Sequence, residues 1–435
     1  MMTISMRALA VALALGAFTA ATPAFAQYGM GAPPPSPPPS VPRPAAKDEA
    51  PAEATEAPGR KYDLSKGARK PIVELQTAVN AKDAANIPAK LAAAQAVAST
   101  KDDKYVIGQL QLKAAVDQKD NAGMIAGIQA MDASGGAAPG ETLPLHTSLG
   151  NQFLKAKQFD IASTEFERAL AIDPNFSDAI VLLAETRKAQ GRVPEAVGLL
   201  QRGIAARVAA GQKPTEDWYK HAVAMAYNAK LPSAIPLSRD WVAAYPTPSS
   251  WRDSLRIYKS GSGLDADVLI DLMRLQRAAG ALAGETDYYN YASTALLKGY
   301  PGEAKAVLDE GFAAKSIDRN KPLFRDVLAA ASAKTAADRA ALPGLEKAAL
   351  ASGAAKQSMV TGDVYLGYGD YAKAAALYRA ALTKTGVDPS LANLRLGIAL
   401  ARSGDKAGAT AAFNAVTGVR ADIAKYWLLW ANSRA

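Results

Sequence analysis

The side chains that most often perform chemistry in proteins are scarce in this chain and widely spaced. Cysteine is absent, which excludes disulfides, thiolate metal ligands and cysteine nucleophiles. The two histidines, His146 and His221, lie far apart, and neither belongs to an H-x-x-x-H or H-x-x-E-H pattern. That spacing is what places two imidazoles on one helical face around a metal ion. The sequence therefore predicts no metal site.

Two glycine-rich strings are similar to cofactor or catalytic motifs only in their letters. Residues 367–372 read G-x-G-x-x-A, but a dinucleotide fingerprint must follow a strand in a βαβ unit, and we expect a turn between helices here. Residues 260–263 do not match G-x-S-x-G. Asp102 and Asp103 stand where a helix is expected to begin, which is typical of helix caps. We therefore expect no catalytic residues and no cofactor, and predict that the protein is not an enzyme.

The composition favours closely packed helices. Hydrophobic residues make up 49% of the chain and aromatic residues 7%, and much of the hydrophobic share is Ala, the best helix former. The 435 residues exceed the roughly 250–300 that one core supports, so several domains or a repeat array are expected. The net charge of +9 is only a mild positive bias. Nucleic-acid binding needs a cluster of basic residues with aromatic residues between them, and the sequence has none, so we expect no nucleic-acid binding.

The first 26 residues have the pattern of a secretory signal. Arg7 gives a positive start, residues 8–20 form an apolar run, and Ala24-Phe25-Ala26 matches a cleavage site. The run of 13 residues is shorter than the about 20 that a membrane-spanning helix needs. We expect cleavage after Ala26, export to the periplasm, and no transmembrane segment in the mature chain. An uncleaved anchor is the alternative.

Residues 27–68 form a segment rich in Pro and Ala that we expect to be a disordered linker. Residues 27–60 contain 10 of the 26 prolines. Because Pro has no backbone donor and a fixed φ, helix and sheet are both disfavoured, and a semi-rigid extended spacer is predicted. A proline-rich ligand for the groove of another protein is the second interpretation.

Residues 143–176 contain the clearest unit of an internal repeat. Positions 7, 8, 11, 20, 24, 27 and 32, counted from Leu143, are occupied by Leu149, Gly150, Phe153, Ala162, Phe166, Ala169 and Pro174. This spacing resembles the tetratricopeptide repeat, a helical pair of 34 residues. Small residues at positions 8 and 20 allow the two helices to touch, while large residues at positions 7, 11 and 24 fill the space between them. Pro174 is expected to end the second helix.

The same register recurs along the chain. Strong matches lie at 355–388 and 390–421, looser matches at 177–210, 215–248 and 285–314, and degenerate pairs near 72–105, 106–140, 249–283 and 320–352. Because one repeat cannot bury its own apolar face, neighbouring repeats must share a core. We predict an all-α fold, an α-solenoid of about ten antiparallel helix pairs over residues 69–421. A bend or break is expected in the weakest units, at 249–283 and 320–352.

Residues 422–435 are expected to form a C-terminal capping helix. Ile423, Tyr426, Trp427 and Trp430 fall at i, i+3, i+4 and i+7, on one helical face. Such a helix would cover the open face of the last repeat. An aromatic docking patch for another protein is the alternative.

The family resemblance implies a place for a partner, because the first helix of each repeat lines a concave groove through positions 2, 5, 9, 12 and 13. The predicted groove residues at such positions are Asn151, Lys155, Glu185, Lys188, Tyr219, Tyr227, Met359 and Asp363. Their mixture of charges, amide and aromatic rings suits an extended or helical segment of another protein. Some family members clamp a terminal carboxylate with Lys and Asn, but Thr147 stands where that clamp has a Lys.

These observations predict a non-enzymatic protein–protein interaction scaffold of the bacterial cell envelope, with other proteins as its partners. Two alternatives stay open: a protein associated with peptidoglycan or polysaccharide, and an assembly factor for outer-membrane export. Repeat architecture sets a shape rather than a ligand, so the pattern names neither the partner nor the oligomeric state.

Overall fold

In the computed structural model the chain is described over residues 61–261, 264 and 266–434, which form α-helices joined by short turns. The signal predicted over residues 1–26 and most of the linker predicted over residues 27–68 lie outside this range. Residues 61–68, the end of that linker, belong to the fold, because Leu64 and Ala68 are buried in one apolar cluster with the first helices. The all-α fold is confirmed for the described residues.

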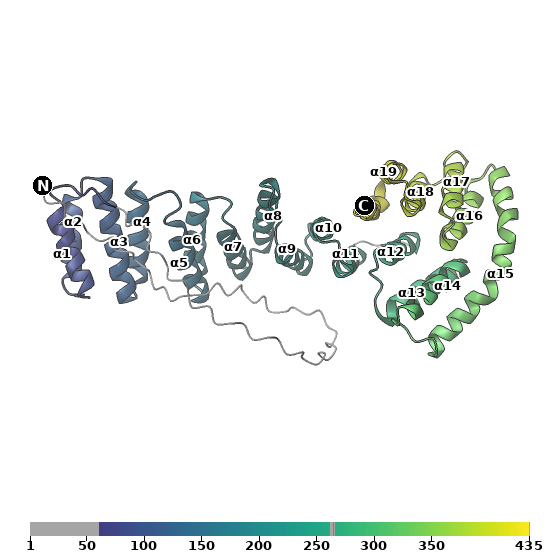
Figure 1. Ribbon diagram of the computed structural model, residues 1–435, viewed down its shortest axis with the longest axis horizontal. Coiled ribbons are helices and arrows are strands. Elements are labelled where there is room, and N and C mark those ends of the chain that lie inside the picture. Colours follow the sequence, from purple (N-terminus) through teal and green to yellow (C-terminus); the bar gives the residue numbers. More distant parts are fainter. Residues whose placement is uncertain (1–60, 262–263, 265, 435) are drawn as a thin grey trace, which may run out of the picture. The chain divides into compact units, whose positions relative to one another are not determined.

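The described helices form two compact units, and the boundary between them falls between Thr186 and Arg187. The helices of the first unit are α1 (Arg69–Asn80), α2 (Ile87–Val97), α3 (Lys101–Gln118), α4 (Asn121–Ala133), α5 (Leu143–Lys155), α6 (Phe159–Ile172) and most of α7 (Ser177–Ala189). In Figure 1 the helices α1 to α6 follow one another in chain order, each packed beside its neighbours.

The second unit contains the other helices. They are α8 (Val193–Ala209), α9 (Glu216–Asn228), α10 (Ala234–Ala244), α11 (Pro248–Gly261), α12 (Ala266–Ala278), α13 (Gly284–Leu297), α14 (Pro301–Ala313), α15 (Pro322–Ala351), α16 (Ala355–Tyr368), α17 (Tyr371–Leu382), α18 (Pro389–Ser403), α19 (Lys406–Asn414) and α20 (Ala421–Asn432). A short 3-10 turn, Gly418–Arg420, precedes α20.

The small and large positions of the three strong repeats meet as the spacing predicts. A Cβ atom added to Gly150 of α5 would lie 2.7 Å from the ring of Phe166 in α6. A Cβ added to Gly397 of α18 would lie 2.5 Å from the ring of Phe413 in α19, and one added to Gly362 would lie 2.8 Å from the ring of Tyr378. Glycine at position 8 therefore lets an aromatic ring at position 24 lie directly on the backbone of the first helix.

The helix pair predicted near residues 320–352 is instead one helix, α15, of 30 residues. Its middle is rich in Ala and contains no glycine before Gly344, which favours one continuous helix. Pro343 lies inside the helix without ending it. Only Phe324, Ala331, Leu342 and Ala349 are buried. No helix of the described residues combines the length and the apolar character required to cross a membrane.

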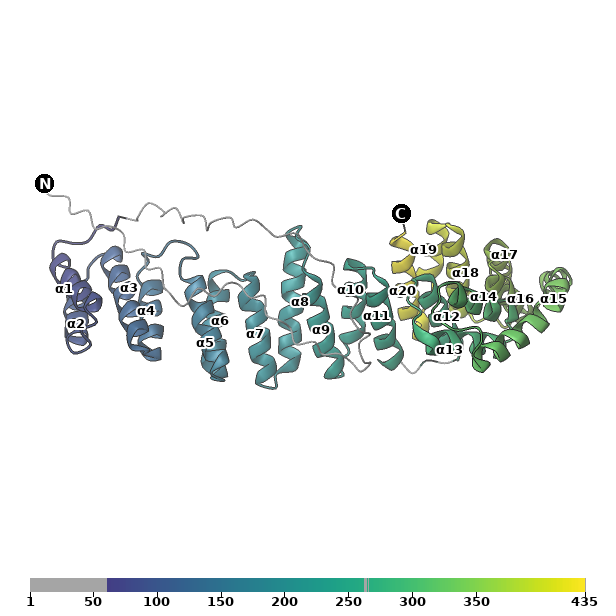
Figure 2. The same ribbon diagram turned by 60° about the horizontal axis from the view of Figure 1, so that its bottom comes forward.

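Helix α12 is the centre of the second unit's largest apolar cluster. Ile270, Leu272 and Leu275 are almost fully buried although they point to different sides of the helix. Figures 1 and 2 show α13 to α19 following an arc that returns to α12, with α20 beside it. The indole Nε1 atoms of Trp427 and Trp430 in α20 donate to the carbonyl oxygens of Asp271 and Ala278. The C-terminal repeats therefore close around α12.

Candidate partner-binding surface

The eight predicted groove residues are divided between the two units. On the first unit, Asn151 and Glu185 are half-buried and Lys155 is exposed; on the second, Lys188 is exposed, Tyr227 and Met359 are half-buried, and Tyr219 and Asp363 are buried. Within the second unit, α9 packs against α8 and α10, whereas α16 packs against α14, α15, α17 and α18. Within the second unit, the predicted groove residues of α9 and of α16 therefore belong to different sets of packed helices.

In the first unit, α3 also has a glycine in close contact with the helix that follows it. A Cβ on Gly108 of α3 would lie 2.9 Å from Met131 of α4, as a Cβ on Gly150 of α5 would meet Phe166 of α6. Met131 follows Gly108 by 23 residues and Phe166 follows Gly150 by 16, so the two glycines share a close contact but lie at different levels of their helix pairs.

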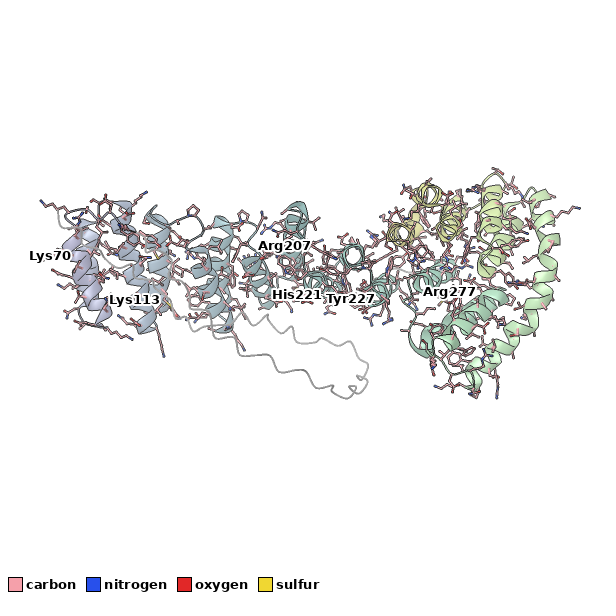
Figure 3. All side chains as sticks on the ribbon, viewed as in Figure 1. Lys70, Lys113, Arg207, His221, Tyr227 and Arg277 are labelled. Atoms are coloured by element: carbon pink, nitrogen blue, oxygen red, sulfur yellow. The ribbon has the colours of Figure 1, made fainter. Side chains whose placement is uncertain are left out.

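With the glycines aligned, an amide and a lysine repeat on the two helices. Gln109 follows Gly108 as Asn151 follows Gly150, and Lys113 and Lys155 each come four residues later. The side chains of Gln109, Lys113 and Asn151 are half-buried, and that of Lys155 is exposed. Lys113, which Figure 3 labels on α3, donates from Nζ to Asn80 Oδ1 at 2.6 Å. We name Gln109, Lys113, Asn151 and Lys155 the amide–lysine stripe.

Asp363 does not face a groove, because it belongs to a buried ion network at the centre of the second unit. Its Oδ2 atom lies 2.7 Å from Nη1 of Arg395, and Arg395 also reaches Asp271 of α12 at 3.3 Å. Arg274 of α12 pairs with Asp271 at 2.9 Å and with Glu303 of α14 at 2.8 Å. The prediction that Asp363 contacts a partner is therefore wrong, since its carboxylate joins α16 to α18.

Tyrosines complete the hydrogen bonding of this network. The hydroxyl groups of Tyr300 and Tyr378 donate to Asp363 at 2.9 and 2.7 Å, and that of Tyr291 donates to Glu303 at 2.7 Å. Carboxylates that accept from arginine and tyrosine at once have few acceptor sites left for a substrate. The network thus joins six helices, α12, α13, α14, α16, α17 and α18, and its carboxylates are engaged in that joining.

The two buried carboxylates of the network respond differently to their surroundings. Burial raises the pKa of Asp363, and the guanidinium groups of Arg395 and Arg274 oppose that rise without cancelling it. Burial also acts to raise the pKa of Glu303, but the paired Arg274 outweighs it, and the pKa is lowered. The bidentate pair with Arg274 explains the difference, since two parallel hydrogen bonds strongly favour the charged carboxylate.

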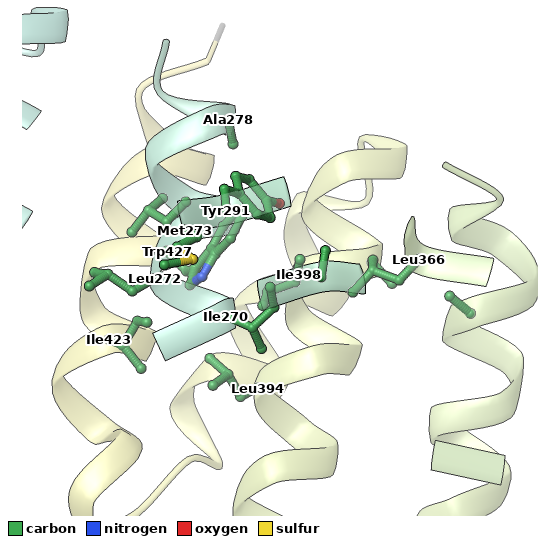
Figure 4. Packing of buried hydrophobic residues seen from close by; sticks show 14 of the residues in the cluster. Ile270, Leu272, Met273, Ala278, Tyr291, Leu366, Leu394, Ile398, Ile423 and Trp427 are labelled. Atoms are coloured by element: carbon green, nitrogen blue, oxygen red, sulfur yellow. The ribbon is translucent and has the colours of Figure 1, made fainter. Parts of the chain in front are cut away.

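Apolar residues close the inner face of the last repeats. Leu394 and Ile398 of α18 occupy groove positions 5 and 9 of their repeat, and Leu366 of α16 occupies position 12. All three are buried in the same cluster as Ile270 and Trp427, and Figure 4 shows these side chains around α12. The chain's own helices α12 and α20 therefore cover the surface that a partner would use in an open solenoid.

Tyr219 of α9 is also unavailable to a partner. It is only 4% exposed, and its ring packs edge-to-face against Tyr245 at 6.1 Å between centroids. Tyr227, labelled with His221 on the same helix in Figure 3, is half-buried. Tyr219, which was predicted to line the groove, thus belongs to the core of this repeat.

His146, to which the sequence analysis assigned no role, lies buried between two carboxylates in the first unit. Its Nδ1 atom is 2.7 Å from Oε2 of Glu165 in α6, and its Nε2 atom is 2.8 Å from Oδ2 of Asp132 in α4. Burial acts to lower the pKa of His146, but the hydrogen bonds of Glu165 and Asp132 outweigh it and raise the pKa. Within the described residues no group of acidic or histidine side chains has the arrangement of a metal site.

Sequence reasoning missed both buried networks, yet it contained one signal for the second. Groove positions are polar in an open solenoid, but two of those in 390–421 are Leu394 and Ile398. Apolar residues at such positions indicate that another helix covers them. Two partners of Arg395, Asp267 and Asp271, lie more than a hundred residues away in the chain and leave no pattern in the local spacing.

Comparisons with known proteins add one family match and two remote structural similarities. A family model described as tetratricopeptide repeat matches residues 153–210. One similar structure is the TPR2AB domain of yeast Sti1 in complex with pHSP90, at 12% identity and a TM-score of 0.24, covering 67% of this chain and 99% of that chain. Another is Naa15/Naa10 bound to HypK-THB, at 14% identity and a TM-score of 0.26, covering 82% of this chain and 64% of that chain.

At these TM-scores neither structure describes how the helices of this chain are arranged. No curated protein matches the chain. The repeat itself therefore carries the assignment. The family model identifies a tetratricopeptide repeat over residues 153–210, and the helix pairs packed on Gly150, Gly362 and Gly397 have the spacing and contacts of that repeat.

Proposed function

We propose that the protein is a non-enzymatic scaffold of the bacterial cell envelope, and that its first unit binds an extended segment of another protein along the amide–lysine stripe. The observation that carries the proposal is that, on both α3 and α5, an amide follows a glycine in close helix contact and a lysine comes four residues later. Side-chain amides can pair with the backbone of an extended chain, and lysines attract its acidic side chains.

The second unit supports this choice by its own packing. Leu394 and Ile398 are buried under α12, so an open groove is not offered by the last repeats. The polar, partly exposed residues of the stripe offer hydrogen-bonding groups instead. Asn151 and Lys155 are among the groove residues predicted from the sequence, and Gln109 and Lys113 extend that prediction to α3.

The test is site-specific photo-crosslinking in cells that produce the full chain. A photo-reactive residue at Gln109 or Asn151 should yield the same adduct, because the two positions would contact one bound segment. The matched control is Lys356 of α16, which is exposed on the second unit. Different adducts from Gln109 and Asn151, or an equal yield of one adduct from Lys356, would count against the stripe.

Localisation to the periplasm is tested separately. Fractionation of the same cells should recover a mature chain beginning at Gln27, since cleavage is expected after Ala26. Recovery of the uncleaved chain from the cytoplasm would overturn the export proposal while leaving the crosslinking result valid. Adducts with peptidoglycan or with an outer-membrane export protein would identify one of the two alternative functions.

A further inference from the structure

A pocket of about 470 Å³ opens where the ends of α18 and α20 meet the start of α19. Arg402, Lys406 and Arg434 line it together with Trp430 and small residues, and no Asp or Glu of the described residues contributes to its wall. The pocket lies within the second unit and shares no residue with the amide–lysine stripe. Three cations around one concave surface are the feature that requires an explanation.

Neutral partners hold the three cations in place. Arg402 donates from Nη2 to the hydroxyl oxygen of Tyr371 at 2.7 Å and from Nε at 3.1 Å. Arg434 lies over the Trp430 ring, 4.6 Å from its centroid, and Arg402 lies 5.9 Å from the same centroid. Nζ of Lys406 donates to the backbone carbonyl oxygen of Arg434. These contacts fix the positions of the three side chains. Because the partners are neutral, they do not compensate the positive charges.

Acidic side chains do not neutralise these cations within the described part of the chain. None of the three has an ion pair there, whereas the nearby Arg277 makes a bidentate pair with Glu310. Asp405 stands next to the pocket, but its Oδ1 atom accepts from the backbone nitrogen of Gly408 and caps α19. Like charges held close together repel one another, and a bound anion would remove that cost.

We propose that this pocket binds an oxyanion, a carboxylate or phosphate group, between Arg402, Lys406 and Arg434. The remaining N–H groups of two guanidiniums and one ammonium supply charge-assisted hydrogen bonds of the kind that both anions accept. Arg402 also lines a narrow void of about 30 Å³ with Arg277 and Trp427. The anion would therefore bind next to the closed centre of the unit and stabilise it.

The experiment measures binding to the full mature chain by calorimetry at low ionic strength, with inorganic phosphate in one arm and citrate in the other. Either arm should show saturable binding that weakens with added salt and raises the melting temperature. Binding in the phosphate arm alone identifies a phosphate site, and binding in the citrate arm alone identifies a carboxylate site. Absence of saturable binding in both arms would overturn the proposal.

Variants separate the pocket from general positive charge. The double variant Lys406→Gln/Arg434→Gln should weaken binding at least about tenfold, equivalent to ~1.4 kcal/mol, and should keep its fold because both side chains are exposed. The control Lys356→Gln/Arg379→Gln removes the same charge from exposed positions elsewhere in the unit. An equal loss in the control would show nonspecific attraction and contradict the pocket.

Discussion

The carboxylate of Asp103 joins three parts of the chain. It is fully buried and accepts from the backbone nitrogens of Ser65, Ser99 and Thr100 at 2.9 to 3.0 Å. Asp103 thereby forms a capping box with Thr100 at the start of α3. The sequence predicted a cap from this aspartate, but its contact with Ser65, 38 residues earlier, could not be read from local spacing.

Stability of the first unit should fall at low pH through this residue. Burial acts to raise the pKa of Asp103, but hydrogen bonds from Thr100, Ser99 and Ser65 outweigh it and lower the pKa from 3.8 to about 2. A lowered pKa stabilises the fold above pH 3.8, and that stability is lost as the pH falls through about 2.

Asp103→Asn should therefore cost on the order of 2 kcal/mol near neutral pH and much less near pH ~2. Hydrogen exchange at the start of α3 measures the loss. Asp326→Asn, at an exposed position of α15, is the control and should change little. A cost for Asp103→Asn that is independent of pH would contradict the assignment.

His146 should produce the opposite pH dependence. Because its pKa in the folded chain lies above the ordinary 6.5, its contribution is complete below pH 6.5 and is lost as the pH rises through the folded value. Exchange of the amides in α4, α5 and α6 should therefore be slower near pH ~6 than near pH ~8 after correction for intrinsic rates.

The variant His146→Gln should abolish that pH difference. His221→Gln is the matched control, because these are the two histidines of the chain. If the pH dependence of amide exchange persists in His146→Gln, it arises from a titrating group other than His146.

At the scale of the helix pair, a glycine and an aromatic ring determine how closely two helices approach. The variant Gly397→Ala places a Cβ 2.5 Å from the Phe413 ring, and the ring is buried at 3% exposure. We expect a loss of about 1–3 kcal/mol in the free energy of unfolding. Chemical denaturation of the full chain measures it.

The control for this prediction is Gly198→Ala in α8, where an added Cβ meets nothing within 4 Å. That change should stabilise the helix by up to about 1 kcal/mol, because Ala loses less backbone entropy than Gly. Equal effects of the two substitutions would show that the close approach at Gly397 is unimportant.

Helix pairs with this glycine–aromatic contact could be predicted from the sequence, because the glycine and the aromatic residue recur at a fixed spacing. Residues 143–176, 355–388 and 390–421 all form the predicted pairs. Residues 320–352 do not, since a single long helix and a helical pair have the same apolar periodicity. Asp338, Pro343 and Gly344, which are typical of turns, lie inside the helix here. The Ala-rich middle of this segment satisfies the helix better than any turn.

At the scale of the second unit, the chain closes on itself, and the contacts at its centre should act as one. Trp427 is 1% exposed and stacks on Phe413, 6.5 Å between centroids, while its nitrogen donates to Asp271 of α12. Trp427→Ala should cost about 3–5 kcal/mol. Hydrogen exchange should become faster in α12 as well as in α18 and α19.

An open solenoid would show faster exchange only in the neighbouring repeats, so unchanged protection of α12 would contradict closure. Val419→Ala serves as the control, because Val419 is 74% exposed and surface substitutions usually change stability by less than about 0.5 kcal/mol. Closure was not predictable from repeat spacing, because spacing describes neighbours and α12 meets α18 and α20 from far along the chain.

The central place of α12 also sets the order in which this unit can assemble. A linear repeat array can begin folding at any repeat and grow from it. Here the bond from Trp427 to Asp271 spans 156 residues, so α12 is synthesised long before α18 and α20 exist to surround it. Its apolar sides must stay exposed on the growing chain, and such distant contacts slow folding. Helix α20, which is made after α12 to α19, thus completes the contacts around α12.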